Sequence, residues 1–125
     1  MRNYTLILAT LISLLLPVQS WGGDIEKGYD AYGSRDYATA VEEWLPLAEL
    51  GDAEAQYLLG VLYTSGLGVT QDYLKAYMWF DISSSKGYYL STMNKEVTAK
   101  YLSLFQVLEA QDLAKECVAK NYKGC

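Results

Sequence analysis

The side chains that could carry out acid–base chemistry in this chain are carboxylates, because its 125 residues include no histidine. Histidine is the commonest general base and the usual partner of a serine or cysteine nucleophile, so its absence disfavours that class of catalysis. The candidate acidic pairs are Glu42–Glu43 and Asp52–Glu54. Adjacent residues on a helix point about 100° apart, so Glu42 and Glu43 are not expected to converge on one bond. We interpret these residues as surface carboxylates and expect no enzyme.

Cysteine chemistry is restricted to Cys117 and Cys125, the only two cysteines in the chain. Seven residues separate them, and a glycine at 124 lets the tail double back, so we favour a structural disulfide in an exported chain. A redox-active pair is an alternative, although the spacing differs from Cys-x-x-Cys. A zinc site is another, although two thiolates without histidine supply only half of the usual ligands. We expect no metal and no cofactor.

Export is predicted from residues 1–22. Arg2 gives a short basic start, residues 4–16 are almost wholly apolar, and Pro17 ends the run. Val18 and Ser20 then place compact residues at positions −3 and −1 of a signal-peptidase site, although a cut after Gly22 is an alternative. The apolar run of about 13 residues is shorter than the roughly 20 that cross a bilayer. We expect cleavage, a periplasmic or secreted protein, and no stable membrane insertion afterwards.

The remaining residues, 23–125, are enough for a single domain and carry only helix signals. Aspartates at 24, 36, 52 and 72 each precede a run with apolar residues three and four apart, which predicts four capped helices. Helical spacing continues over 88–101, and a capping box of Ser103 and Gln106 opens a sixth helix through residue 118. No alternating run is long enough for a strand, so we expect an all-α fold.

Two stretches of the chain match each other at a shift of 36 residues. The four matched residues Asp36, Tyr37, Ala40 and Gly51 recur as Asp72, Tyr73, Ala76 and Gly87. Self-similarity with a fixed period of this length is typical of stacked helical repeats, in which one unit cannot bury its apolar face alone.

Residues 52–87 resemble a full Sel1-like repeat (SLR), a branch of the tetratricopeptide (TPR) superfamily. The positions that carry the resemblance are Ala55, Leu59, Gly60, Leu62, Tyr63, Gly66, Gly68, Val69, Asp72, Ala76, Trp79 and Gly87. Residues 24–51 resemble a shorter unit without the Gly-x-Gly connection, and we interpret 88–125 as a degenerate unit that caps the stack. The resemblance implies an α/α solenoid of about three antiparallel helix pairs.

The same resemblance implies a protein-interaction module whose concave groove binds a peptide or protein segment. Tyr29, Tyr57 and Val61 lie off the apolar stripes of the first helices, on the side that lines the groove in such stacks, and exposed tyrosine is frequent at binding hot spots. We therefore predict these three residues as partner-binding. The alternative is a weak cell-envelope hydrolase that acts through carboxylates, as suggested by the export signal and by cysteine-rich relatives of the family.

The charge is unevenly distributed along the chain, whose formal net charge is −5. Residues 24–54 contain nine carboxylates and two basic residues, whereas residues 72–125 contain seven lysines and six carboxylates. The overall acidity argues against nucleic-acid binding. The acidic half is either a solvated surface or a docking face for a basic partner, and both interpretations stay open.

The export prediction has a direct measurement. N-terminal sequencing of protein recovered from the cell envelope or medium should begin near Trp21 or Gly23, because the signal segment is removed during export. Recovery of a membrane-anchored chain that starts at Met1 would contradict the prediction.

Overall fold

The computed structural model describes residues 22–125, so the expected signal segment lies outside the described residues except for Gly22. The described part is all helical and contains no strand, which confirms the expected fold class. Its six helices are α1 (Ile25–Gly33), α2 (Tyr37–Glu49), α3 (Ala53–Ser65), α4 (Tyr73–Ser85), α5 (Tyr89–Ala99) and α6 (Leu104–Ala119).

Aspartate side chains begin the first four helices, as the sequence predicts. Asp24, Asp36, Asp52 and Asp72 occupy the N-cap positions, and each accepts a hydrogen bond from a backbone N–H of the first turn. At α6 the expected capping box is present, with Ser103 and Gln106 bonded reciprocally. Each such cap stabilises its helix by about 0.5–2 kcal/mol, because it satisfies backbone donors that have no partner within the helix.

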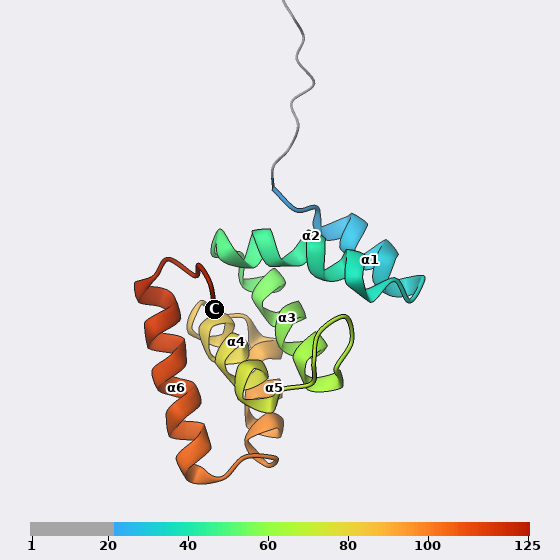
Figure 1. The fold of residues 1–125 in the computed structure, drawn as a ribbon. Helices are drawn as coiled ribbons and strands as arrows, with labels where there is room; N and C mark the ends of the chain where they lie inside the picture. Colours follow the sequence, from blue (N-terminus) through green and yellow to red (C-terminus); the bar gives the residue numbers. More distant parts are fainter. Residues whose placement is uncertain (1–21) are drawn as a thin grey trace, which may run out of the picture.

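The helices pack mainly against their neighbours in sequence, and α4 lies at the centre of the stack (Figure 1). It contacts α3 most extensively, and it also contacts α5 and α6. The core contains the large side chains Trp44, Leu59, Leu62 and Trp79 and the small ones Ala40, Ala48 and Ala55, all of them almost fully buried. The small residues let helix backbones approach closely, which the repeat pattern requires.

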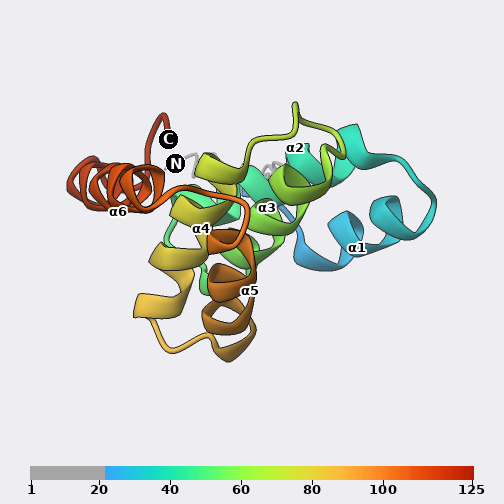
Figure 2. The ribbon, with the colours of Figure 1, turned by 90° about the horizontal axis from the view of Figure 1, so that it is seen from below.

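The last helix departs from simple pairing. Extensive contacts join α6 to α4, whereas α5 and α6 do not pack along each other. The two views agree, since α4 lies between them (Figures 1 and 2). The division of the chain into units at 24–51, 52–87 and 88–125 stays a prediction.

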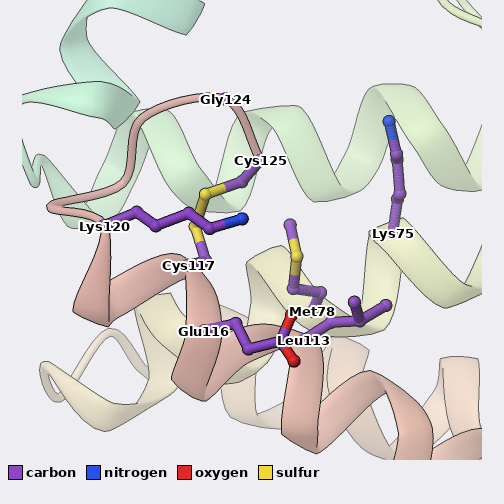
Figure 3. Close-up of a pocket in the computed structure, with 8 residues that line it drawn as sticks. All are labelled: Lys75, Met78, Leu113, Glu116, Cys117, Lys120, Gly124 and Cys125. Carbon is purple, nitrogen blue, oxygen red and sulfur yellow. A yellow bond between two sulfur atoms is a disulfide. The ribbon is translucent and has the colours of Figure 1, made fainter.

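Cys117 and Cys125 form a disulfide with a Cα–Cα distance of 5.6 Å, in agreement with the favoured interpretation. The bond links the buried face of α6 to the end of the tail (Figure 3). Within the tail, the Tyr122 ring lies 4.2 Å from the ammonium of Lys86, which also donates to the carbonyl of Gly51. The tail therefore returns to the turn between α2 and α3.

Gly60 of α3 should be intolerant of a side chain. A Cβ at this position would lie 2.5 Å from Cε1 of Phe80, which is 1% exposed in α4. We expect Gly60→Ala to lower the free energy of unfolding by about 1–3 kcal/mol, because the ring must shift within a close-packed core. Urea denaturation followed by circular dichroism measures the change.

Gly33→Ala is the matched control for Gly60→Ala. Its Cβ would meet nothing within 4 Å, so its stability should stay unchanged or rise by up to about 1 kcal/mol. Equal losses in the two variants would show that helix propensity, and not contact with Phe80, sets the cost.

Removal of the disulfide by the double substitution Cys117→Ala and Cys125→Ala should lower the stability by at most about 2–3 kcal/mol, the chain-entropy estimate for so short a loop. Thermal unfolding of the oxidised protein and the variant measures the difference. Thiol titration provides the check, because two reactive thiols per chain in protein purified under oxidising conditions would contradict the pairing.

Candidate interaction surface

The first helices of the successive pairs, α1, α3 and α5, follow one another with α3 in the middle (Figures 1 and 2). Tyr29 of α1 donates a hydrogen bond from its hydroxyl to Oε1 of Glu54 in α3, at 2.5 Å. One turn further along α3, the ring of Tyr57 lies 5.3 Å from that of Tyr88, the N-cap residue of α5. Side chains on one side of the molecule therefore join all three first helices.

We call this surface the tyrosine face and define it by Tyr29, Glu54, Tyr57, Val61 and Tyr88. Tyr29 is 39% exposed, and the other four are half-buried. The three residues predicted as partner-binding thus lie on neighbouring helices of one surface. Aromatic side chains with one solvent-exposed edge and one packed edge are common at protein interfaces, because they supply a large contact area with little loss of entropy on binding.

Each tyrosine of the face is held by the core beneath it. The Tyr29 ring meets the buried indole of Trp44 edge-on, with 5.3 Å between ring centroids. The Tyr57 ring lies 5.8 Å from the buried ring of Phe80. Tyr57 is therefore also a packing residue, and its removal would lower stability as well as any affinity for a partner.

Glu54 and Tyr88 were not among the predicted site residues. Glu54 precedes Tyr57 by three residues and so shares its helix face, a spacing that would have placed it beside the tyrosine. Tyr88 occupies the N-cap of α5 but makes no capping hydrogen bond with its side chain. Tyr88 lies 36 residues after Asp52, the N-cap of α3, so the repeat has an aromatic residue where a capping aspartate is expected. That difference is the sequence signal that could have identified Tyr88.

The electrostatics of the face favour neutral tyrosines. Burial raises the pKa of Tyr29 well above its ordinary value, and the hydrogen bond to Glu54 and the charge of that carboxylate raise it further. Burial likewise raises the pKa of Tyr88, with a second contribution from the Glu54 charge. Both side chains therefore keep their hydroxyl protons at neutral pH. Tyr88 can donate its proton to a partner, whereas Tyr29 already donates to Glu54 and can accept a hydrogen bond from one.

Three of the four carboxylates considered for catalysis have structural partners, and the fourth, Glu42, is exposed. Glu43 accepts a hydrogen bond from the Asp24 backbone at 2.8 Å and pairs with Lys27 at 3.0 Å. Asp52 caps α3 through the N–H of Ala55, and Glu54 binds Tyr29. Among residues 22–125, no group of three histidine, cysteine or acidic side chains is placed to hold a metal ion.

A cavity of about 120 Å³ lies between the disulfide and α4, away from the tyrosine face. Met78, Leu113 and the two cysteines line it, and the charged groups of Lys75, Glu116 and Lys120 stand at its edge (Figure 3). Sites for small molecules usually measure about 300–1,000 Å³, so this cavity is small for such a ligand.

Comparison with protein families finds that residues 53–88 match the model of the Sel1 repeat, a segment that runs from the start of α3 to the N-cap of α5. The chain therefore contains a Sel1 repeat, and the resemblance seen in the sequence is confirmed. Sel1 repeats generally mediate protein–protein interactions, and repeat families of this kind are typically non-enzymatic. Searches of curated proteins and of solved structures found no match. Across residues 22–125, none of the helices has the length and hydropathy of a membrane span.

The raised pKa of Tyr29 predicts a loss of stability at alkaline pH. Below about pH 10, the ordinary tyrosine pKa, the hydroxyl is protonated in both the folded and the unfolded chain. Above it, the unfolded chain loses this proton while the fold retains it, so stability falls as pH rises. Tyr29→Phe cannot ionise and should lose less stability than the parent between about pH 9 and pH 11. Denaturation curves at both pH values test this, and identical losses in the two proteins would refute it.

Proposed function

We propose that this chain is a non-enzymatic interaction module that acts outside the cytoplasm and binds a peptide or protein segment across the tyrosine face. The observation that carries the proposal is a pair of contacts, Tyr29 with Glu54 and Tyr57 with Tyr88, which lie one turn apart along α3. It spans three helices with partly exposed aromatic side chains, the residue type most often responsible for affinity in protein interfaces.

Two further features support the proposal. The Sel1 repeat at residues 53–88 belongs to a class that generally mediates protein interactions. The cysteine pair and the signal-like N-terminal segment favour an oxidising compartment outside the cytoplasm. The hydrolase alternative receives no such support, because three of its four candidate carboxylates, Glu43, Asp52 and Glu54, have structural partners within the fold.

Photo-crosslinking in cells that export the protein tests this function. A benzophenone amino acid in place of Tyr29 should yield defined adducts with a partner, because this position is 39% exposed on the tyrosine face. The matched control carries the same group in place of Phe105, an aromatic of α6 that is 76% exposed. Circular dichroism of both variants establishes that they fold. Adducts of equal yield at both positions, or adducts at position 105 alone, would contradict the proposal.

A further inference from the structure

The rows of side chains that continue the tyrosine face onto α5 and α1 differ sharply in chemistry. Glu54, Tyr57 and Val61 of α3 correspond, 36 residues later, to Leu90, Met93 and Val97 of α5. These three apolar side chains are 45%, 48% and 50% exposed. On α1, the first-helix shift of 31 residues makes Glu26 and Asp30 the counterparts of Tyr57 and Val61, and both are exposed.

Burial on the opposite side of each helix supports this correspondence. Ala55 and Leu62 of α3 are fully buried, and so are their α5 counterparts, Ser91 and Thr98. The α1 counterpart of Leu62, Ala31, is buried as well. The agreement is closest between α3 and α5. On α1, Glu26 lies one turn from both Tyr29 and Asp30, so these three exposed side chains share one side of the helix.

The α1 end of the surface is acidic and has little basic compensation. Glu26, Asp30 and Glu54 carry its negative charge, and the cation of α1, Lys27, is paired with Glu43 of α2 at 3.0 Å. On α5, by contrast, the apolar row is flanked by Glu96 and Lys100, which are one turn apart and of opposite charge. The surface therefore changes from acidic over α1, through aromatic over α3, to apolar over α5.

We propose that the bound segment is polarised in the complementary way, with basic side chains over α1 and apolar side chains over α5. This inference rests on the proposed function and specifies the chemistry of the partner. Opposite charges favour a basic end over Glu26 and Asp30, and half-exposed apolar side chains gain most from burial against other apolar groups.

The repeat spacing sets the length of such a segment. The Tyr29–Glu54 hydrogen bond joins α1 to α3, and the Tyr57–Tyr88 ring contact joins α3 to the start of α5. We therefore take the rows on α1 and α5 to be roughly 20 Å apart, about twice the distance between packed helix axes. An extended chain rises about 3.3 Å per residue, so about six residues separate its basic and apolar ends. We therefore specify the partner as an extended segment with a basic pair, a spacer of about six residues and an apolar pair.

Fluorescence polarisation with synthetic peptides tests the polarity. The parent probe carries Lys-Arg, six serine and glycine residues, and Leu-Phe, and two further probes replace one end or the other by serines. The parent should bind at least about tenfold more tightly than either truncated probe, a difference of 1.4 kcal/mol. The difference in affinity between the parent and the probe without the basic pair should decrease as the salt concentration is raised. A parent probe that binds no more tightly than the truncated ones overturns the inference.

Protein variants assign each end of the probe. The double variant Glu26→Gln with Asp30→Asn should lose the preference for probes with the basic pair and keep that for the apolar pair. The double variant Met93→Ser with Val97→Ser should lose the preference for probes with the apolar pair and keep that for the basic pair. The matched controls alter exposed residues of α6, which lie outside the rows. They are Glu109→Gln with Asp112→Asn, and Leu108→Ser, and they should change neither of the two preferences. Equal effects of the α6 variants would overturn the assignment.

Two other outcomes separate this inference from the proposed function. If position 29 crosslinks to a partner but the probes bind equally well, the proposed polarity is wrong and the interaction role stands. If position 29 gives no crosslinks, both the interaction role and the polarity are wrong. A chain that sediments as a dimer, and becomes a monomer when Val97 is changed to Glu, would show that a second copy covers the α5 row, and the inference would be wrong.

Discussion

The contact between Phe80 and the bare backbone at Gly60 determines how the rest of the structure is arranged. It lies within the interface of α3 and α4, the most extensive helix contact in the described residues. Glycine removes the side chain that would keep the two helices apart, so the ring can lie directly on α3. The same ring lies 5.8 Å from that of Tyr57, which in turn lies 5.3 Å from that of Tyr88. Interior packing thus places the tyrosines of the outer surface.

The first helix pair uses the same arrangement. The indole of Trp44, 36 residues before Phe80, lies against Gly28 of α1 and orients Tyr29 at the surface. The third pair differs, because Ser103, the N-cap of α6, follows Asp72, the N-cap of α4, by 31 residues, so the 36-residue period does not continue into α6. The helices α5 and α6 do not pack along each other, and α6 packs on α4 instead.

Local signals in the sequence were sufficient for the elements and for part of the packing. The N-cap aspartates and the capping box at Ser103 follow from residues close together in the chain. The recurrence of Ala40 as Ala76, both fully buried, follows from the repeat period. The hydrogen bond from Tyr29 to Glu54 could not be predicted in this way, since it depends on how closely two helices approach across 25 residues of sequence. The position of the Tyr57 ring beside two other rings could not be predicted either. Helix periodicity gives the direction of a side chain but not which side chains of other helices lie beside it.

The C-terminal tail compensates for the missing contact between α5 and α6. Asn121 and Tyr122 have φ angles of 53° and 64°, a left-handed conformation that is unfavourable for residues other than glycine. Contacts on both sides maintain it: the disulfide closes the loop behind these residues, and Lys86 holds the Tyr122 ring beside the carbonyl of Gly51. The tail thereby connects the end of α6 to the turn between α2 and α3, at the opposite end of the helix from its link to α5. Two attachments, one to α4 and one through the tail, therefore fix α6 in a position that repeat packing alone would not give it.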